Sequence, residues 1–574
     1  MFKNNIEYQQ FGLFDSLNNL TQKQSKVLSN SIEHSFFENI FCKINENDFK
    51  VLYSNKKSRP NVPVNQLVGS LILKHLYNWT YEELFKNLNF NLLTRWAIGV
   101  RNISEDIFSE ASIYNFQNKV IDYYVSTGTD LLSEVFDNLT KSQLEEFGIN
   151  TGIQRGDSFL IGSNIFDYTR LQLLIEVLIR ILRVIDKNDR QQYAHLFTAY
   201  TKQTAGQYIY RVSKEDLPKE ISKLSVVYHS LYNLLKGKYN DVAVFRVFER
   251  VYKEHFEIVG NKVQVIPSNR LNSSVLMSPD DTEATFRDKG KLGKKGYSGH
   301  ISETAGPNNK LNLITDCVVI PNNVDDAQIL ESRLPEMLSK TPDLAEYHAD
   351  SNYGSPSVDV IMENNNIVQV QTAVRGRKAY AKMQIEQGQD NAYWVTCENG
   401  QRVKAEKASK GKNAKSHKAV FDYEKCLLCP LMAKCNTRIM GVKTNKPKRT
   451  WYFSEEKIRM HKRLQNINSI PEERRTIRAN VEATVKEVKR GIKNGKVRIR
   501  GNKRIAFYLC LTAIAVNLTR IHKYITDHDR NWPKQPATNV NNLLKNIFPI
   551  IQEGKKRIYQ AVLKNAFAIS IMPV

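Results

Sequence analysis

Hydrophobic residues recur at helical spacing through the first 150 positions of the chain. In VNQLVGSLILKHLYNW, residues 64–79, the apolar side chains lie three and four positions apart, which predicts a buried helix. TYEELFKNL follows directly, and its Thr80 and Glu83 have the spacing of a capping box at a helix start. We therefore expect two helices joined by a very short turn. Such a pair is either ordinary bundle packing or a helix-turn-helix that reads DNA.

The pattern changes to strands near residue 154. RGDSFLIGS predicts a short strand with Asp157 near its start, and a helical tract then runs to about residue 260. GYSGHISETA and KLNLITDCVVIP predict two strands joined by the turn GPNNK, and DAQILESRLPEML predicts a helix. LAEYHADSNYGSPSVDVIM predicts strand, turn and helix with Asp350 at the strand end, and NIVQVQTAV predicts a last strand. Strands alternating with helices indicate an α/β sheet, which often carries its chemistry at strand ends.

The carboxy-terminal third begins with a lysine-rich, irregular segment and then returns to helices. Residues 375 to about 455 show no regular hydrophobic period, whereas the segments that begin at Pro471 and Ile505 do. We expect four parts: a helical domain that contacts DNA, an α/β core with a helical insertion near 165–260, a basic insertion, and a helical part that completes the core. Their bounds are 1–150, 151–374, 375–455 and 456–574.

One amphipathic stretch, RTIRANVEATVKEVK, places an acid among bases. At about 100° per residue, one stripe that should be buried is formed by Ile477, Val481, Val485, Val488 and Ile492. An arc of about 60° at the edge of this stripe holds Arg475, Arg478, Glu482 and Lys489. On one interpretation, Arg478 and Lys486 simply form i,i+4 ion pairs with Glu482, each worth about 0.2–0.5 kcal/mol. On the other, the acid works against a polyanion.

The charge of the chain favours a polyanionic partner. Lys and Arg number 83 against 59 Asp and Glu, a formal charge of +24. Residues 401–500 contain 28 bases and 9 acids, whereas residues 1–150 contain 14 and 17, so most of the excess lies in one region. Nucleic acid is the expected partner, although a ribosomal or anionic-lipid partner would also fit the charge alone.

Neither an export signal nor a disulfide framework is indicated. The amino terminus lacks a basic stretch followed by an apolar one, and the longest apolar run, IAFYLCLTAIAVNL, is interrupted and too short for a bilayer. Seven cysteines, an odd number, argue against paired disulfides. We expect a soluble protein in the cytoplasm, without a Walker-type phosphate loop or a GxSxG elbow.

Three acids could form a metal site for phosphodiester chemistry. Two-metal cleavage requires carboxylates that hold two divalent cations about 3.5–4 Å apart, and Mg²⁺ prefers oxygen ligands. Asp157 and Asp350 at strand positions and Glu482 on a packed helix could supply them. Taken singly, each Asp could equally be a turn or cap residue, so spacing alone does not select these three.

The ordered motifs resemble those of bacterial insertion-sequence transposases of the DDE type. Arg478, Glu482 and Lys489 match the Arg, Glu and Lys of a family signature, Tyr-x2-Arg-x3-Glu-x6-Lys, while Arg475 stands at the Tyr position. The resemblance also covers RPNVPVNQLVGSLILKHLYNWTYEELFKNLNFNLLTRWAIG, RGDSFLIGSNI, HADSNYGSPSV and AFYLCLTAIAVNLTRI, and therefore most of the chain.

This resemblance implies an RNase H-like catalytic core and cut-and-paste DNA transposition. It implies that Asp157, Asp350 and Glu482 bind two Mg²⁺ (or Mn²⁺) ions, which activate water to nick the element end and then the 3′-hydroxyl to attack target DNA. Arg475, Arg478, Lys486 and Lys489 would contact this DNA. The partners implied are the terminal inverted repeats, target DNA at the bacterial nucleoid, and a second copy of the chain in a synaptic dimer. Two rivals are a related metal-dependent nuclease without strand transfer and a non-catalytic zinc-containing nucleic-acid-binding protein.

The cysteines form a second candidate metal site. Cys426, Cys429 and Cys435 have the spacing C-x2-C-x5-C, and Cys397 lies 29 positions earlier. Four thiolates around Zn²⁺ would stabilise an insertion without a core of its own, with His417 as the alternative to Cys397. Three reduced thiols in a loop are the simpler reading. The other cysteines, Cys42, Cys317 and Cys510, lie among apolar residues and are expected in the core.

A Gly- and Lys-rich segment precedes one of the predicted strands. RDKGKLGKKGYSGH, residues 287–300, is either a phosphate-contacting loop or a flexible solvated one, and its place in the resemblance favours a DNA contact.

Overall fold

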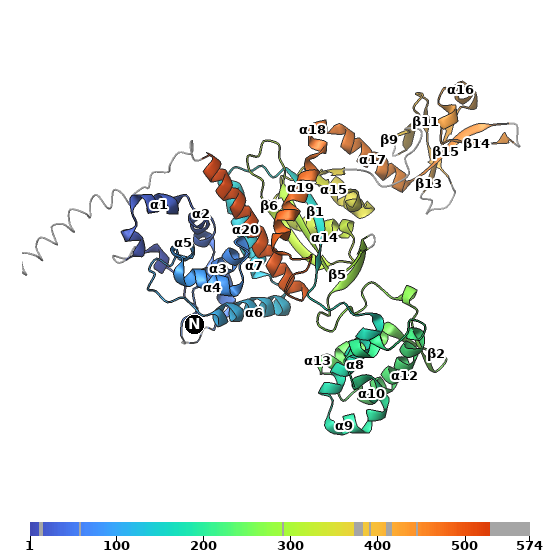
Figure 1. Ribbon diagram of the computed structural model, residues 1–574. Helices are drawn as coiled ribbons and strands as arrows, with labels where there is room; N and C mark the ends of the chain where they lie inside the picture. Colours follow the sequence, from blue (N-terminus) through green and yellow to red (C-terminus); the bar gives the residue numbers. More distant parts are fainter. Residues whose placement is uncertain are drawn as a thin grey trace, which may run out of the picture. The chain divides into compact units, whose positions relative to one another are not determined.

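A computed structural model describes most of the chain, namely residues 1–10, 15–54, 56, 59–289, 292–371, 383–389, 392–408, 416–442 and 446–528. The chain divides into two compact units, Met1–Ile521 and His522–Val574, and only residues 522–528 of the second are described. The rest of the predicted 456–574 part therefore lies outside the described residues. The first unit contains the sheets and nearly all of the helices (Figure 1).

The described part of residues 1–150 is helical, as predicted. Thr80 and Glu83 form the expected capping box, and Asn78 (φ +55°) lies in the short turn between α3 and α4. The helices are α1 (Gln22–Ser29), α2 (Ile32–Asn39), α3 (Val64–Leu76), α4 (Tyr81–Phe90), α5 (Leu92–Ala97), α6 (Glu110–Thr127) and α7 (Leu131–Glu146).

These helices share one hydrophobic core with the central sheet. Buried residues of α3 and α7 belong to the same cluster as Phe159, Ile301 and Ile514. The amino-terminal helices therefore pack onto the sheet as part of its core instead of forming a bundle with a separate core.

The central sheet has six strands of mixed direction. β1 (Ile153–Gly162) is antiparallel to β5 (Leu292–Thr304) on one side and parallel to β7 (Glu346–Ala349) on the other. β8 (Val368–Gln371) continues beyond β7, again parallel. β4 (Thr285–Lys289) pairs with the first part of β5, and β6 (Ile314–Pro321) pairs with its second part. The expected α/β sheet is confirmed, and the Lys-rich segment 287–300 belongs to the β4–β5 hairpin rather than to a loop.

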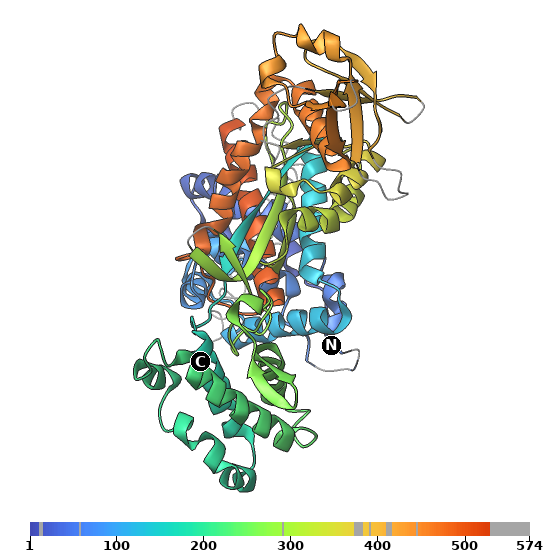
Figure 2. The same ribbon diagram turned by 90° about the vertical axis from the view of Figure 1, so that its right-hand side faces the viewer.

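Helices cover both faces of this sheet (Figures 1 and 2). α14 (Asp326–Lys340) and α15 (Pro356–Asn364) pack with Tyr347 and Ala349 of β7 in one core. α19 (Val481–Val488) and α20 (Asn502–His528) pack with Phe159 and Ile161 of β1 in the other. Side chains alternate along a strand, so Arg155 and Asp157 face the α19 side together with Phe159.

The predicted helical tract after β1 is also present. It contains α8 (Arg170–Val184), α9 (Lys187–Gln192), α10 (Ala194–Thr201), α11 (Ala205–Tyr210), α12 (Leu217–Leu235) and α13 (Ala243–His255), which Figure 2 shows in teal and green. A two-stranded sheet, β2 (Phe256–Val259) and β3 (Lys262–Val265), follows. These helices surround a hydrophobic core of their own.

The Lys-rich segment is not irregular, contrary to expectation. Its described residues form a three-stranded sheet, β9 (Gln384–Gln387), β10 (Tyr393–Thr396) and β11 (Arg402–Lys404), and a four-stranded one, β12 (Glu406–Lys407), β13 (Ser416–Phe421), β14 (Arg438–Met440) and β15 (Lys448–Ser454). In β13, His417, Ala419 and Phe421 are buried while Lys418 points outward. Lysines on the outer face of such short strands hid the period of two.

The stretch 471–492 is broken where one helix was expected. α17 (Glu455–Ser469) and α18 (Glu472–Arg475) are followed by a 3₁₀ turn at Ile477–Asn480 and then by α19. Arg155 Nη1 donates to the Ile477 carbonyl oxygen at 3.0 Å, so a side chain takes an acceptor that a continuous α-helix would use internally. Of the predicted stripe, Val481, Val488 and Ile492 are buried, whereas Ile477 and Val485 are only partly covered.

α20 is longer than the sequence indicated. By length and composition alone this 27-residue helix could cross a membrane, although 72 % of its most apolar window is buried inside the protein. The expectation that the apolar run is too short was therefore wrong. Its burial is that of a core helix.

Candidate active site

Asp157 lies on the central strand, on the face covered by α19. Its side chain is 15 % exposed, and its Oδ1 accepts the Ser158 backbone N–H at 2.9 Å. Burial raises the pKa of the Asp157 carboxyl, and the nearby charge of Asp350 raises it further, while Arg478 acts in the opposite direction. A partly buried carboxyl beside a second acid is an environment that favours binding of a cation.

Asp350 follows the end of β7, as predicted. The last register pair of the parallel strands joins Arg155 to His348, so Asp157 and Asp350 each lie two positions further along neighbouring strands. The Asp350 Oδ1 accepts the Asn352 N–H at 2.6 Å and caps a 3₁₀ turn at Ser351–Tyr353. This hydrogen bond fixes the carboxylate at the end of the strand.

Glu482 approaches from the first turn of α19. Its side chain is 66 % exposed, and its Oε1 accepts a hydrogen bond from Arg478 Nη1 at 3.0 Å. The other terminal nitrogen of the same guanidinium donates to Asp157 Oδ2 at 2.9 Å. Arg478 thus bridges the first and third acids, and Asp350 lies beside the first. The structure thus links Glu482 to Asp157 through Arg478 and places Asp350 near Asp157.

The four predicted DNA-contacting bases have different environments. Arg478 forms the bridge between Asp157 and Glu482, and its i,i+4 pair with Glu482 is one that the ion-pair interpretation expected. Arg475 donates from Nε to the Ile470 carbonyl and from Nη2 to the Asn468 carbonyl, both at 3.0 Å, so it closes the preceding turn. Lys486 is exposed, and Lys489 Nζ lies 5.6 Å from the centroid of the Phe159 ring.

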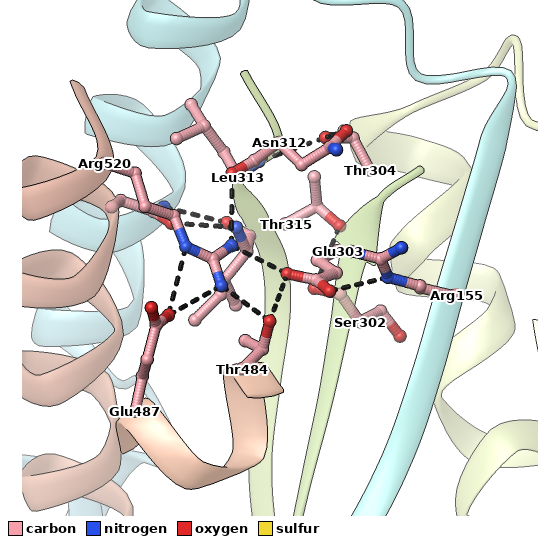
Figure 3. Close-up of polar contacts among 12 residues, drawn as sticks. Arg155, Ser302, Glu303, Thr304, Asn312, Leu313, Thr315, Thr484, Glu487 and Arg520 are labelled. Atoms are coloured by element: carbon pink, nitrogen blue, oxygen red, sulfur yellow. Dashed lines mark hydrogen bonds and ion pairs between the residues drawn. The ribbon is translucent and has the colours of Figure 1, made fainter. Parts of the chain in front are cut away.

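A buried charge network, which the sequence did not indicate, holds α19 against the sheet (Figure 3). Its centre is Glu303 of β5, whose side chain is fully buried. Glu303 Oε1 accepts from Arg155 Nε at 2.7 Å, and Oε2 accepts from Arg520 Nη1 at 2.7 Å and from Thr484 Oγ1 at 2.8 Å. Two arginines and one hydroxyl therefore satisfy a single buried carboxylate.

This network ties down both ends of the segment that carries Glu482. Arg155 binds Glu303 and the Ile477 carbonyl on the amino-terminal side. On the carboxy-terminal side, Arg520 Nη2 donates to Thr484 Oγ1 at 2.6 Å and to Glu487 Oε2 at 2.8 Å. The position of Glu482 relative to Asp157 is thus fixed from both sides.

A sequence signal for Glu303 was available. Ile301 and Glu303 lie two positions apart on one predicted strand, so they share a face, and Ile301 belongs to that face's apolar pattern. An acid on the buried face of a strand requires a charged partner. What the sequence could not supply is which arginines, 148 and 217 positions away, would be those partners.

The four candidate zinc ligands line one small cavity. Cys397, Cys426, Cys429 and Cys435 all border a space of about 30 Å³, enough for one water-sized guest. Burial raises the pKa of the Cys426 thiol, and the nearby Cys397 and Cys435 thiols add to this, while Arg449 lowers it. Arg449 lines the same cavity and would favour thiolates.

The alternative zinc ligand and one predicted core cysteine lie elsewhere. His417 Nε2 is 2.7 Å from Glu455 Oε1, and its ring stacks on Phe453, so His417 does not complete the cysteine set. Cys510 is buried and Cys317 partly buried, but Cys42 is exposed, contrary to expectation. Its place on a short 3₁₀ turn, Phe41–Lys43, leaves the adjacent Phe41 to fill the core.

Among the described residues, no group of three or more His, Cys, Asp or Glu side chains is already arranged as metal ligands. At the acid site, Arg478 occupies carboxylate oxygens that a metal ion would use. Asp157 and Glu482 therefore already bind one cationic group at this site, the guanidinium of Arg478. The donor set, three carboxylates and no thiol or imidazole, suits Mg²⁺ or Mn²⁺.

Comparison with known families gives two matches. Residues 20–119 match the model described as transposase domain (DUF772), and residues 396–522 match the one described as transposase DDE domain. The resemblance to an insertion-sequence DDE transposase is confirmed. Both matched domains are those of DNA transposases, enzymes that act on DNA, and the DDE family generally uses divalent metal ions.

The two matches cover the candidate site unequally. The DDE match contains Glu482, the cysteines and the network residues Thr484 and Arg520, whereas Asp157 and Asp350 lie outside both matched ranges. No curated protein and no solved structure matches the chain. The family matches therefore do not cover Asp157 and Asp350, and the evidence for their roles is their position in the structure.

Proposed function

We propose that the protein cleaves the ends of an insertion sequence and joins them to target DNA, in a reaction that requires Mg²⁺ or Mn²⁺. The observation that supports this most strongly is that Arg478 joins Asp157 of β1 to Glu482 of α19, while Asp350 at the end of β7 lies close enough to Asp157 for its charge to raise the Asp157 pKa. Buried ion pairing alone would not require acids from three distant segments at one partly open point.

The three acids would supply the oxygen ligands for two metal ions. Bound there, such ions would activate the attacking oxygen and stabilise the leaving one. Asp157 must be ionised to serve as a ligand, which its raised pKa opposes and Arg478 favours. Arg478 would then release the carboxylates and donate its two N–H groups to an oxygen of the scissile phosphate, because a guanidinium suits phosphate geometry.

The fold that carries these acids is proposed to be an RNase H-like core. Supporting this, β1 is central, is antiparallel to β5 and parallel to β7, and carries the first acid, while its parallel neighbour ends at the second. The four-part division of the chain is part of the same proposal. The helices α8–α13 would form the helical insertion and the strands β9–β15 the basic one.

Of the predicted DNA contacts, Lys486 and Lys489 are proposed to bind phosphates near the scissile bond. Lys486 is exposed on α19, four residues after Glu482. Lys489 lies over Phe159, on the same strand and face as Asp157. Arg475 is proposed instead to shape the turn before α19, because its guanidinium is bound to two backbone carbonyls.

The cysteine cavity is proposed to hold one structural Zn²⁺. Cys397, Cys426, Cys429 and Cys435 converge on a space of suitable size, and tetrahedral thiolate sites of this kind stabilise small β-rich segments. Arg449 supports the deprotonated thiols from one side. The zinc would be structural, since the four thiols leave no ligand position for water.

The partners proposed are the terminal inverted repeats, target DNA and a second copy of the chain. Synapsis of two element ends supports a dimer, and DNA as the substrate places the enzyme in the bacterial cytoplasm, at the nucleoid.

The test is incubation of the full chain with a duplex taken from the DNA that flanks its gene, in Mg²⁺. We expect a nick at the element boundary, followed by products joined to a target plasmid. Nicking without joined products would identify a nuclease of the same fold, and binding without nicking would identify a non-catalytic DNA-binding protein.

A further inference from the structure

A basic turn follows α19, the helix that carries Glu482, and this turn is not part of the candidate active site. Residues 489–504, KRGIKNGKVRIRGNKR, contain eight Lys and Arg and no acid. We define the basic turn as Lys493–Arg498. Lys493, Lys496 and Arg498 are exposed, and among the described residues none of the three forms an ion pair with an acid.

Lys493 and Lys496 flank a tight turn. Asn494 (φ +52°) and Gly495 (φ +73°) are its two central residues, the conformation that Asn-Gly sequences favour. Lys493 and Lys496 form the backbone bridge that flanks them, with Lys496 N donating to the Lys493 carbonyl at 3.0 Å. Lys496 Nζ donates to the Ile165 carbonyl oxygen at 3.4 Å, which holds its ammonium group beside the turn.

More cations surround the turn. Burial lowers the pKa of the Lys74 ammonium, and the charge of Arg498 lowers it further, so these two groups are close enough to repel. Lys294 of β5 lies beside Gly495. Two acids interact with the lysines of the turn but also have other partners. Hydrogen bonds from Thr80 lower the pKa of Glu83, and the charge of Lys493 lowers it further. Lys295, at 2.8 Å, lowers the pKa of Asp167, and the charge of Lys496 adds to this.

The turn is anchored to the strand that carries the first acid. Gly162 N donates to the Gly495 carbonyl at 2.8 Å, and Val497 N donates to the Gly162 carbonyl at 3.1 Å. Gly162 is five residues beyond Asp157 on β1, which is roughly 17 Å along the strand. Successive phosphates on one DNA strand are about 3.4 Å apart along the helix axis. A duplex whose axis runs along β1 would therefore place about five nucleotides between the acids and the turn.

We propose that Lys493 and Lys496, supported by Lys74, Lys294 and Arg498, bind the phosphate backbone of duplex DNA about five nucleotides from the scissile phosphate. This inference rests on the proposed function and adds a second contact to it. The partner is a polyanion with regularly spaced charges, since a single small anion would neutralise only part of a cluster spread over β5, α3 and the turn.

The test compares binding of an element-end duplex by the wild type, by Lys493→Ala/Lys496→Ala, and by the control Lys187→Ala/Lys214→Ala. The control removes two exposed lysines from the α8–α13 region. Binding is measured by fluorescence anisotropy at 50–200 mM salt, in EDTA so that no cleavage occurs. Each lost phosphate contact lowers the slope of log K against log salt by about 0.9.

We expect the slope of the turn variant to be lower by about 1.8 and that of the control to be unchanged. Because both side chains are exposed, we also expect little change in melting temperature. Equal slopes for the wild type and the turn variant, or an equal decrease in the control, would overturn the inference while leaving the proposed function intact. A wild type that does not bind the duplex at all would instead contradict the proposed function.

Discussion

At the scale of single residues, the guanidinium of Arg478 and the carboxyl of Asp157 set the chemistry of the site. Arg478 donates to Asp157 and to Glu482, and so holds these two acids close to each other. Burial and the charge of Asp350 act in the other direction, raising the pKa of Asp157. Metal binding therefore depends on a balance between these groups.

Replacing Arg478 should shift the pH dependence of DNA cleavage. Arg478→Gln removes the charge that lowers the pKa of Asp157, so this pKa rises further and the carboxylate is lost at a higher pH. We expect the acidic limb of the pH–rate profile to move to higher pH. The control Lys486→Gln, a neutralised base on the exposed face of α19, should leave the position of that limb unchanged. A shift to lower pH for Arg478→Gln would contradict the pKa argument.

Asp157 should act against folding at neutral pH. The pKa of the Asp157 carboxyl is raised in the folded state, so the protonated carboxyl stabilises that state. This stabilisation is complete below the unfolded-state pKa and is lost as the pH rises through the folded-state pKa. Asp157→Asn should therefore have a melting temperature at pH 7 no lower than that of the wild type, and the difference should shrink towards pH 4.

Asp316 provides the matched contrast. It is buried and accepts from Arg333 Nε at 3.0 Å and from Arg333 Nη2 at 2.5 Å, and its pKa is lowered. Asp316→Asn leaves Arg333 without its buried charge partner and with only the exposed Glu336, and should lose about 3–5 kcal/mol of stability. Calorimetry of both variants at pH 7 checks the pair, and equal losses of stability would contradict the assignment of Asp157.

The identities of the three acids could be predicted from the sequence, but the hydrogen bonds that link Asp157 to Glu482 through Arg478 could not. Asp157 and Asp350 follow from strand positions and motif resemblance, and their parallel strands then bring them together. The bridge through Arg478 depends on the 3₁₀ turn before α19, and that turn depends on Arg155, more than 300 positions away. Periodicity within one segment contains no information about such a contact.

At the scale of elements, Glu303 connects strand and helix. It contacts Arg155 of β1, Thr484 of α19 and Arg520 of α20 (Figure 3). Three elements that carry or flank the proposed catalytic acids therefore share one buried carboxylate. The register of α19 against β1 depends on it.

Glu303→Gln should impair both folding and catalysis. Removing one partner of a buried ion pair leaves uncompensated charge, here on Arg155, while Arg520 keeps only the half-exposed Glu487. This should lower the free energy of unfolding by about 3–5 kcal/mol. At a temperature where the variant remains folded, we expect the cleavage rate to fall while DNA affinity is maintained, because Glu482 loses its position and the basic surface does not.

The control for this variant is Glu487→Gln. Glu487 contacts the same Arg520 but is 51 % exposed, so its loss should change stability by less than about 1 kcal/mol. Urea denaturation and single-turnover cleavage measure the two effects. A Glu303→Gln variant with wild-type cleavage would show that the network stabilises the fold without positioning Glu482.

Long elements with a strong period were predictable, and short ones were not. The capping box at Thr80, the strand around Asp157 and the α8–α13 tract are all present as expected. The strands β9–β15 were missed because each spans only two to seven residues, and in β13 lysine alternates with core residues. The break before α19 was missed because a distant arginine causes it.

At the scale of the whole molecule, hydrophobic cores of different size stabilise different regions. The amino-terminal helices, the sheet and α20 share one large core, and α8–α13 have their own. The described part of 383–454 has only seven fully buried hydrophobic residues, from Met383 to Phe453. A core of that size is expected to need a metal or other cross-link.

Zinc removal should therefore affect that region selectively. We expect one zinc per chain in purified wild type, and its loss in Cys426→Ser, with faster proteolysis within 383–454 and little change in the helical regions. Cys42→Ser, which alters an exposed thiol far from the cavity in sequence, should retain the zinc. Elemental analysis and limited proteolysis measure this, and zinc-free wild-type protein would contradict the metal site.

The central claim is that Asp157, Asp350 and Glu482 act as one metal-binding set on DNA. The most direct measurement is the Mg²⁺-dependent cleavage rate of a duplex containing the element end, for Asp157→Asn, Asp350→Asn and Glu482→Gln separately, with Glu487→Gln as the control on the same helix. We predict that each of the three variants binds the duplex but cleaves it at least about 10²–10³-fold more slowly, the size of effect seen when one stabilising group of a transition state is lost. Wild-type cleavage by any one of them would contradict the claim.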